Sequence, residues 1–467
     1  MAQSQDIIAN QVFDEIEIGS SASINRRLTQ KDIQLFAVMS GDVNPAHLDA
    51  DYAKDSMFHE VIAHGLWGGS LISTVLGTIL PGLGTIYLSQ SLRFRQPVRL
   101  GDMLTVTVTA KAKKPDDHIV VFDCQCTNQD DQVVIEGEAE VIAPTEKIER
   151  PRVNLPNVRV AERGRLREMF DAASSLDPLP TAVVHPCSEY ALRGAIESAE
   201  ANLILPHLVG PEIKIREVAD QCELDISQYP LIDVEHSHEA AEKAVAMGRD
   251  CEVNALMKGS LDTAELLQAV LHKEHGLRSE RRISHVYAFD VPTYPRPVLV
   301  TDAAINIAPN LDQMRDIVQN AIDLAHALDI ETPKVALLSA VEKVNHDIQS
   351  TLTAAGLCKM ADRGQITGGI LDGPLAFDNA VSPAATAAKG IESEVAGQAD
   401  ILVAPDLEAA NILAKQLIYL ADAQGAGIVM GARLPIILTS RSDSVMQRIA
   451  SSSLAILYHN HHLRYPN

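Results

Sequence analysis

The segment GLWGGSLISTVLGTIL, from Gly65 to Leu80, is apolar on almost all sides and rich in small residues. This composition is typical of a helix that is buried all round. Four stretches with a period near two follow it: TIYLSQSLRFRQPV, DMLTVTVTAKAK, HIVVFDCQCTN and QVVIEGEAEVIA. They predict antiparallel strands joined as a meander, with the helix packed in the concave face of the sheet.

The stretch from Pro144 to Val160 contains three prolines and no sustained period, which is typical of a linker. Beyond it, short apolar runs alternate with helical stretches, a pattern that indicates a mostly parallel sheet covered on both faces. The runs are TAVVHP, LILPHLVG, NALMKGS, SHVYAFDV, PVLVTDAAINI, KVALLSAV, GGILDGP, ADILVAPD, GIVMG and LPIILTS.

We therefore expect a multidomain chain of 467 residues. An N-terminal α+β domain covers residues 1–145, a linker covers 146–164, and an α/β domain covers 165–467. The C-terminal domain is expected to have mostly parallel sheets in two subdomains around a cleft.

The composition limits the partners of the chain. A net charge of −23 disfavours nucleic acid and anionic membrane surfaces, which share its sign. No apolar run reaches the roughly 18 residues that span a bilayer, and the first residues do not resemble a secretory signal. The six cysteines are scattered without a CxxC pair, which argues against a disulfide framework. These features favour a cytoplasmic protein.

The segment SGDVNPAHLD, from Ser40 to Asp49, places a carboxylate and an imidazole five residues apart. On one continuous helix, Asp42 and His47 would lie roughly 140° apart around the axis. Gly41 and Pro45 favour a loop, which can aim both side chains into one pocket where they deprotonate a water. The alternative is structural: Asp42 and Asn44 satisfy turn backbone, and His47 caps the next helix.

Gly65 follows in the sequence IAHGLWGGS and is expected at the N-terminus of the buried helix. There its backbone N–H and the helix dipole can stabilise an oxyanion. The alternative role for Gly65, Gly68 and Gly69 is close packing of the helix on the sheet. In order and spacing, SGDVNPAHLD, FHEVIAHGLWGGSLIS and LRFRQPVRLGD resemble the MaoC-like hot-dog hydratases, the (R)-specific enoyl-CoA hydratases, over about residues 10–143.

This resemblance implies a hot-dog fold, usually paired as a dimer. It also implies syn addition of water to a trans-2-enoyl-CoA, giving an (R)-3-hydroxyacyl-CoA. Asp42 and His47 match the family's catalytic pair, and Gly65 matches its donor to the thioester oxygen. Ser73 falls where the family often has a supporting hydroxyl, which implies a substrate-binding role.

Polar residues follow several apolar runs of the C-terminal half. The run from Leu434 to Leu438 leads into TSRSDS. In open α/β sheets, ligands bind beyond the carboxyl ends of strands, and a guanidinium there can hold phosphate bidentately. The alternative is an N-cap for the next helix. Comparable polar sets end other runs and together predict a cleft: Lys258 and Ser260; Thr301, Asp302 and Asn306; Asp406 and Asn411.

This half resembles the phosphate acetyl/butyryltransferase family over about residues 165–467. The matching stretches are LMKGSLDTAELL, VTDAAINIAPNLDQMRDIVQNAIDLA, KMADRGQITGGILDGPLAFDNAVS, AGQADILVAPDLEAANILAKQL and PIILTSRSDS. The sequences GPLAFDNA and TSRSDS favour the butyryl branch of the family. The resemblance implies reversible acyl transfer between coenzyme A and inorganic phosphate, without a covalent acyl-enzyme.

In this resemblance Arg441 binds phosphate and Ser440 polarises the reacting thioester. Asp443 is the nearest carboxylate that can act as a base toward the CoA thiol. Two positions depart from the acetyl branch: Gln268 stands where that branch has an arginine, and Gln447 lies in the region of its catalytic aspartate. Either the butyryl branch binds phosphate differently, or the transferase activity is reduced.

No metal site is expected, because His459, His461 and His462 lack a paired carboxylate or cysteine and favour a polar tail. No P-loop is present, and GAGIVMG misses the GxGxxG spacing. We therefore expect no tightly bound cofactor. The implied substrates are acyl-CoA thioesters and phosphate.

The leading hypothesis is a bifunctional enzyme: an enoyl-CoA hydratase fused to a phosphate acetyl/butyryltransferase, and a homo-oligomer through both domains. The alternative is a hydratase alone, whose C-terminal half is an oligomerisation or acyl-CoA-binding scaffold. A nucleotide-dependent dehydrogenase is disfavoured by the missing glycine fingerprint. The acyl-chain length is not predicted, because it depends on how side chains shape the pocket.

Overall fold

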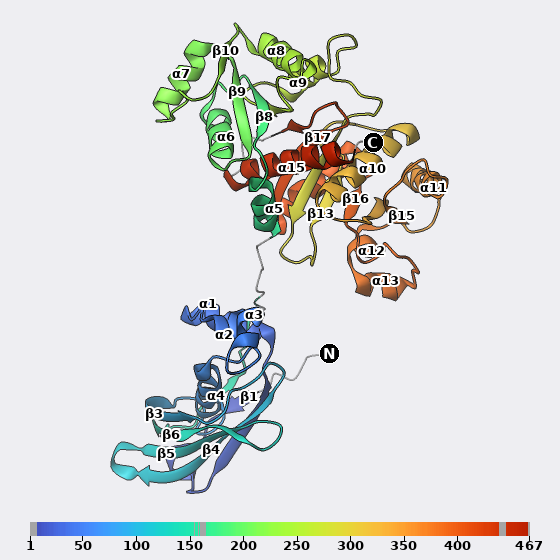
Figure 1. The fold of residues 1–467 in the computed structure, drawn as a ribbon. Coiled ribbons are helices and arrows are strands. Elements are labelled where there is room, and N and C mark those ends of the chain that lie inside the picture. The colour runs from blue at the N-terminus through green and yellow to red at the C-terminus, as the bar shows by residue number, and fades with distance from the viewer. Residues whose placement is uncertain (1–6, 154, 157, 159–164, 439–444, 466–467) are drawn as a thin grey trace. The chain divides into compact units, whose positions relative to one another are not determined.

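The computed structural model describes residues 7–153, 155–156, 158, 165–438 and 445–465. The chain divides into two compact units, Met1–Val160 (unit 1) and Ala161–Asn467 (unit 2), whose elements are labelled in Figure 1. The division falls within the stretch expected to be a linker. Part of that stretch is a strand, since β7 (Glu149–Pro151) pairs with β1 (Ile7–Ala9) inside unit 1.

Unit 1 is built on a five-stranded antiparallel sheet in the order β2-β4-β5-β6-β3. Its strands are β2 (Ser21–Arg27), β3 (Ile86–Phe94), β4 (Met103–Lys114), β5 (Ile119–Thr127) and β6 (Val133–Ile142). All four alternating stretches form strands, and β4, β5 and β6 make the expected meander. The expectation that β3 begins the meander is wrong. β3 pairs with β6, because the short polar strand β2 occupies the free edge of β4.

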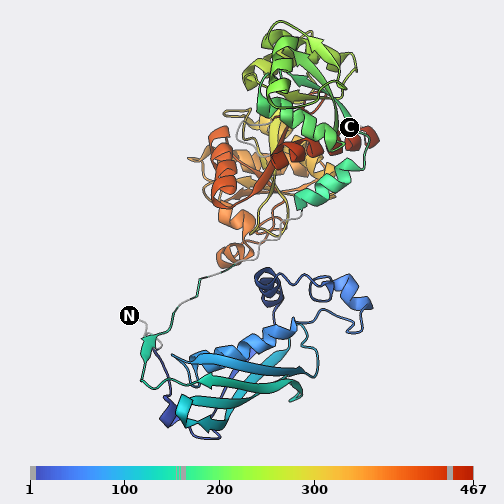
Figure 2. The ribbon, with the colours of Figure 1, turned by 90° about the vertical axis from the view of Figure 1, so that its left-hand side faces the viewer.

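Helix α4 (Gly65–Thr78) begins at the predicted residue and lies against the sheet (Figure 2). Its face with Trp67 belongs to the core of unit 1. A Cβ on Gly68 would overlap Ile135, so the glycine lets helix and sheet approach closely. The expectation that this helix is buried on all sides is wrong for the single chain. The face opposite Trp67 is open, with Leu66 at 61% exposure.

The other elements of unit 1 are η1 (Phe13–Glu15), α1 (Gln30–Ser40), α2 (Pro45–Leu48), α3 (Ala50–Asp55) and η2 (Pro115–Asp117). Figure 1 shows α1, α2 and α3 gathered at one end of the unit. Helix α1 ends because Gly41 caps it in the left-handed conformation, with φ at 75°. The chain leaves α1 there and forms the loop that precedes α2.

Unit 2 contains one eleven-stranded sheet in the order β10-β9-β8-β11-β18-β17-β12-β13-β16-β14-β15. Its strands are β8 (Leu179–Val184), β9 (Ile204–Gly210), β10 (Leu231–Asp233), β11 (Ala255–Lys258), β12 (Ser284–Asp290), β13 (Val298–Thr301), β14 (Lys334–Leu338), β15 (Ile370–Leu375), β16 (Ile401–Val403), β17 (Gln424–Met430) and β18 (Ile436–Ile437). All ten apolar runs are confirmed as strands, and the three-residue β10 was not expected. One continuous, mostly parallel sheet replaces the separate sheets expected for two subdomains.

The helices of unit 2 cover both faces of this sheet. They are α5 (Arg165–Ser174), α6 (Glu189–Glu200), α7 (Glu212–Gln221), α8 (Ser237–Arg249), α9 (Thr263–Val270), α10 (Leu311–Ala327), α11 (Gln349–Asp362), α12 (Phe377–Val381), α13 (Pro383–Lys389), α14 (Leu407–Leu420) and α15 (Val445–Arg464). Along β8, Val183 packs in the cluster that includes α6, α10 and α15, whereas Val184 packs with α8 and α9. None of the described helices is both long enough and apolar enough to cross a bilayer.

Three antiparallel pairs, β18–β17, β17–β12 and β12–β13, interrupt the parallel order at the centre of the sheet. Strands β10, β9, β8, β11 and β18 therefore run opposite to β13, β16, β14 and β15. The residues that follow β11 and those that follow β13 consequently lie at opposite edges of the sheet, not at one shared edge.

Candidate functional site

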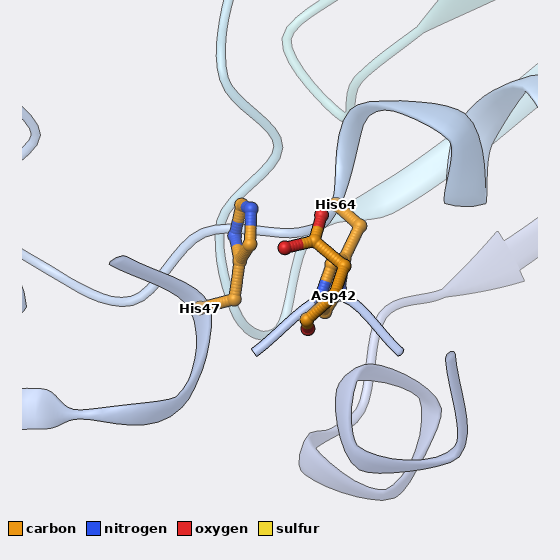
Figure 3. Close-up of side chains that lie close together, drawn as sticks. All are labelled: Asp42, His47 and His64. Atoms are coloured by element: carbon orange, nitrogen blue, oxygen red, sulfur yellow. Dashed lines mark hydrogen bonds between the residues drawn. The ribbon is translucent and has the colours of Figure 1, made fainter. Parts of the chain in front are cut away.

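The fold brings Asp42 and His47 together and adds His64 to them (Figure 3). One nitrogen or oxygen atom of each side chain lies within 4.8 Å of those of the other two. Asp42 lies in the loop after α1, His47 on α2, and His64 directly before α4. The pair converges because Gly41 and Pro45 interrupt the helix, as the sequence predicts.

His47 is held in one tautomer when neutral. Its Nδ1 lies 2.9 Å from the carbonyl oxygen of Ile62. A carbonyl only accepts, so Nδ1 carries a proton and donates it. The lone pair of the neutral ring is then on Nε2, where it can accept a proton from a water molecule. Figure 3 shows the Asp42 carboxylate turned toward this ring.

Asp42 is held at both its main chain and its side chain. Nε2 of the buried His64 donates to the Asp42 carbonyl oxygen over 3.1 Å. The Asp42 carboxylate accepts from the Asn44 N–H over 3.2 Å, so the structural role expected for a turn residue is present as well. The His64 ring also packs on the His47 ring, with centroids 4.0 Å apart.

The sequence analysis does not predict His64 as a candidate site residue. The signal that could have found it is its position directly before Gly65 in IAHG. Its partner, the main chain of Asp42, lies 22 residues away, and no spacing rule predicts that contact.

Gly65 is the first residue of α4, and the side chain of the N-cap residue makes no capping hydrogen bond. A Cβ on Gly65 would lie 3.3 Å from the Phe94 ring, so its small size also serves packing against β3. Gly65 is exposed, which leaves room for a ligand at the helix N-terminus. Ser73 lies on the exposed face of the same helix, eight residues further along.

In unit 2, Lys258 and Ser260 lie beside residues that follow β8. The Ser260 hydroxyl forms a hydrogen bond with the Ser188 hydroxyl. Nδ1 of His185 donates to the Ser260 carbonyl oxygen over 3.1 Å. His185 and Ser188 were not identified from the sequence, although His185 lies in the run TAVVHP and Ser188 follows it two residues later.

Ser440, Arg441 and Asp443 lie outside the described residues. Strand β18, which leads toward them, pairs in parallel with β11. It is shorter than the run from Leu434 to Leu438 on which the strand was predicted. The chain leaves β18 at the edge of the sheet where Lys258 ends β11 and Ser260 follows it.

Thr301, Asp302 and Asn306 form a separate cluster at the end of β13, and all three are buried. The Thr301 hydroxyl donates to the carbonyl oxygen of His285 over 2.9 Å. The Asp302 carboxylate accepts hydrogen bonds from the chain itself, namely from the N–H groups of His285, Ala304, Ile305 and Asn306 and from the Asn306 amide. These polar atoms shape their own loop. Burial lowers the pKa of neighbouring His285 to about 4, an effect that Asp302 opposes.

The remaining polar residues at strand ends have structural partners. Asp406 caps α14, accepting from the Ala409 N–H over 2.8 Å. The Asn411 amide donates to the carbonyl oxygen of Ala303 over 3.0 Å. Gln268 lies on α9 and lines a cavity of about 360 Å³ with side chains of α8 and of the residues after α9: His238, Glu242, Arg249, His272 and His275.

The histidines near the C-terminus lie on α15, so the expectation of a polar tail is wrong. His461 and His462 line a cavity of about 310 Å³ together with Asp323 and His326 of α10. Asp323 already forms an ion pair with Arg281. Desolvation by burial lowers the pKa of His461, which favours its neutral form.

Comparison with known proteins assigns both halves. Residues 235–456 match the family model described as phosphate acetyl/butaryl transferase, and residues 14–128 match the MaoC like domain. The phosphate acetyltransferase of Rickettsia felis is 57% identical over 290 residues, which cover 62% of this chain and 83% of that protein. A probable phosphate butyryltransferase of Bacillus subtilis is 43% identical over 292 residues, 62% of this chain and 97% of that protein.

Among solved structures, a branched-chain phosphotransacylase from Enterococcus faecalis aligns with 28% identity and a TM-score of 0.54, covering 61% of this chain and all of that one. The higher identity to an acetyltransferase than to the butyryltransferase does not support the lean toward the butyryl branch. On these grounds the chain belongs to the phosphate acetyl/butyryltransferase family and carries a MaoC-like hot-dog domain as well.

Proposed function

We propose that unit 1 hydrates trans-2-enoyl-CoA to (R)-3-hydroxyacyl-CoA, and that unit 2 transfers acyl groups reversibly between coenzyme A and inorganic phosphate. The observation that carries the hydratase function is the convergence of Asp42 and His47, with the His47 lone pair on Nε2. The match of residues 14–128 to the MaoC like domain supports this class of reaction. Membership of the acyltransferase family supports the second activity.

In the hydration, His47 Nε2 takes a proton from a water molecule that the Asp42 carboxylate also holds. The hydroxide forms a bond to C3 of the enoyl thioester, and the π electrons move to the thioester oxygen. The N–H of Gly65 and the positive end of the α4 dipole stabilise that enolate oxygen. A proton then returns from the Asp42–His47 pair to C2, so one water has been added across the double bond.

The same pair handles both the water and the returning proton, so both add to one face of the substrate. This accounts for syn addition and for a single product configuration. Ser73, on the exposed face of α4, supports the bound thioester.

In unit 2, Lys258, Ser260 and Arg441 bind phosphate, since a guanidinium and an ammonium both attract it. A phosphate oxygen attacks the thioester carbonyl, which Ser440 polarises. The C–S bond breaks, acyl phosphate forms, and the proton that the phosphate loses passes to the thiolate, so that coenzyme A leaves as the thiol. Asp443 acts as the base toward that thiol in the reverse direction. The adjacency of β11 and β18 supports this grouping.

We assign Thr301, Asp302 and Asn306 to the shape of their loop and not to substrate contact, because their polar atoms are engaged within the chain. The acyl-CoA occupies a cleft between two parts of unit 2. One part comprises β8 to α9 and the other β12 to α14, and Figure 2 shows these elements, green and yellow to orange, gathered in different parts of the unit.

The protein acts as a homo-oligomer, and each unit offers a surface for a second copy. Strand β3 is an edge of its sheet and exposes Ile86, Leu88 and Phe94. Helix α14 exposes Ile412 and Leu420. Apolar side chains at these positions are typical of subunit contacts.

Two assays on the purified protein test the proposal. Hydration of crotonyl-CoA is followed by loss of the enoyl thioester absorbance. Phosphate-dependent release of thiol is measured with acetyl-, propionyl- and butyryl-CoA. Both activities are expected in the same preparation. Hydration without thiol release from any of the three would instead identify unit 2 as an acyl-CoA-binding or oligomerisation scaffold, the reading that Gln268 and Gln447 favour.

A further inference from the structure

The turn that carries Lys258 and Ser260 lies where the order of strands in the sheet reverses. From β8 the chain proceeds to β9 and β10 on one side, whereas β11 lies on the other side of β8. The loops after β8 and β11 diverge at such a point, and open α/β sheets bind ligands there. Residues after β8 are therefore neighbours of any ligand held by the β11 turn.

The two loops are fixed to one another by their main chains. The N–H of Gly259 donates to the carbonyl oxygen of Val184 over 2.9 Å, and the N–H of Ser260 donates to that of His185 over 2.8 Å. A Cβ on Gly259 would overlap both of these carbonyl groups. Only glycine fits this close approach, so the position of Lys258 and Ser260 depends on the β8 loop.

Ser188 is the N-cap residue of α6, but its side chain makes no capping hydrogen bond. Its hydroxyl instead bonds the hydroxyl of Ser260. Two hydroxyl groups carry two protons, and their mutual hydrogen bond uses one of them. The second proton stays available for an acceptor such as a phosphate oxygen.

His185 holds the same turn from its other side. Its φ of 54° lies in the left-handed region, which histidine, asparagine and aspartate tolerate better than most residues. This conformation accompanies the hydrogen bond from its Nδ1–H to the Ser260 carbonyl oxygen. Ser260 is thus held at its hydroxyl by Ser188 and at its carbonyl by His185.

The charge nearby suits an anion. Lys258 is partly buried, and within the part of the chain that the structure describes it has no carboxylate in ion-pair contact. This is notable in a chain with a net charge of −23. The structural alternative, in which His185 and Ser188 only tie two loops together, predicts an effect on stability and none on phosphate binding.

We propose that Ser188 and His185 are positioning residues for phosphate in the acyl transfer, acting through Ser260 and keeping its hydroxyl and the Lys258 ammonium aimed at one anion. This inference rests on the transferase function proposed above. It adds the β8 loop to the phosphate site.

The test is phosphate-dependent thiol release from acetyl-CoA by the full-length protein, with each substrate varied in turn. Ser188→Ala is expected to raise the KM for phosphate about tenfold or more, as the loss of a hydrogen bond near a charged ligand does. The KM for acetyl-CoA is expected to stay within about twofold. Ser188→Thr keeps the hydroxyl and restores the KM for phosphate.

Ser382 provides the matched control. It is also an N-cap serine, but its side chain does accept a capping hydrogen bond, from Ala385. Ser382→Ala should lower the melting temperature and leave the KM for phosphate unchanged, the reverse of Ser188→Ala. His185→Asn, which supplies an amide N–H and tolerates the same φ, should retain phosphate binding that His185→Ala loses.

Adding Ser188→Ala to Ser260→Ala should cause no further rise in the KM for phosphate, because Ser188 acts through Ser260. Two results would overturn the inference if the wild-type protein is active. One is a KM for phosphate that Ser188→Ala leaves unchanged, and the other is a double variant in which the effects of Ser188→Ala and Ser260→Ala on that KM add fully. If Ser188→Ala fails to fold, the variants His185→Asn and His185→Ala provide the test instead. Equal KM values for phosphate in these two variants would also overturn the inference. A wild-type protein without thiol release refutes the transferase function itself.

Discussion

A single hydrogen bond determines how His47 can act. Because its Nδ1 donates to the Ile62 carbonyl, the basic nitrogen of the neutral ring is Nε2. His64 is oriented by the same kind of contact, from its Nε2 to the Asp42 carbonyl. Two carbonyl oxygens therefore set the orientation of both rings and the position of Asp42.

His47→Gln is expected to lower the kcat for crotonyl-CoA hydration by about 10²- to 10⁴-fold, the range for loss of a general base. His64→Phe keeps a ring against His47 but loses the donor to Asp42. It should lower kcat by about tenfold, corresponding to one lost hydrogen bond. Steady-state hydration assays measure both effects. His59→Gln, at an exposed histidine in the same unit, serves as the control, and an unchanged rate for His47→Gln would exclude its role as base.

The buried His285 makes stability depend on pH. Its folded-state pKa of about 4 lies below its ordinary value of 6.5, so the unfolded chain binds the proton more strongly. Its contribution is complete above about pH 6.5 and is lost as the pH falls toward 4, by about 3 kcal/mol in total. Urea unfolding at several pH values should show that His285→Leu loses less free energy of unfolding than the wild type as the pH falls. The exposed His346→Leu should behave like the wild type, and parallel curves for all three proteins would contradict the assignment.

Sequence alone predicts candidate site residues where they lie in short motifs. Asp42, His47 and Gly65 were predicted, and the structure brings the first two together. His185 and Ser188 were not, because they meet Ser260 only when β8 and β11 become neighbours, more than 70 positions apart in sequence.

Two glycines, one in a helix and one in a strand of unit 1, differ in whether a larger side chain would fit. Gly77 lies on α4 with nothing within 4 Å of a built Cβ, whereas a Cβ on Gly137 of β6 would overlap the Ser91 carbonyl of β3. Gly77→Ala should raise the free energy of unfolding by about 0.5–1 kcal/mol, because alanine loses less backbone entropy in a helix.

Gly137→Ala should lower the free energy of unfolding by more than that amount, because β3 must move away from β6. Denaturant unfolding of the two variants and the wild type makes the comparison. The packing described for β3 and β6 would be wrong if Gly137→Ala were as stable as the wild type.

The strands of both units could be predicted because their apolar patterns are strong. Their partners could not all be predicted, since the place of β3 depends on β2, whose sequence SASINRR holds only two apolar residues. β10 was missed because three residues carry no periodicity. The exposed face of α4 was also not foreseen, because an apolar composition does not show which element covers it.

The hydratase-like motifs and the acyltransferase-like motifs lie in two different compact units of the molecule. Each proposed site uses residues of one unit only. Lys258→Ala should therefore strongly reduce phosphate-dependent thiol release and leave crotonyl-CoA hydration unchanged. Both activities are measured on the same full-length variant. A parallel loss of hydration, with the fold intact, would show that the two sites depend on each other.

The two-part organisation could be predicted because the periodicity changes from alternating strands to continuous apolar runs near residue 160. The relative direction of the strands could not be predicted from the sequence. The antiparallel centre formed by β17 and β12 separates the residues after β11 from those after β13, although both sets follow similar apolar runs.

If one chain holds two independent acyl-CoA activities, Asp42→Asn should abolish one of them and spare the other. Crotonyl-CoA hydration and phosphate-dependent thiol release from acetyl-CoA are measured in the same preparations of wild type and variant, with Asp116→Asn as an exposed control. Asp42→Asn is expected to lose hydration and keep thiol release, while the control keeps both. Full hydration by Asp42→Asn would refute the role of Asp42, and loss of thiol release together with hydration would refute the independence of the two activities.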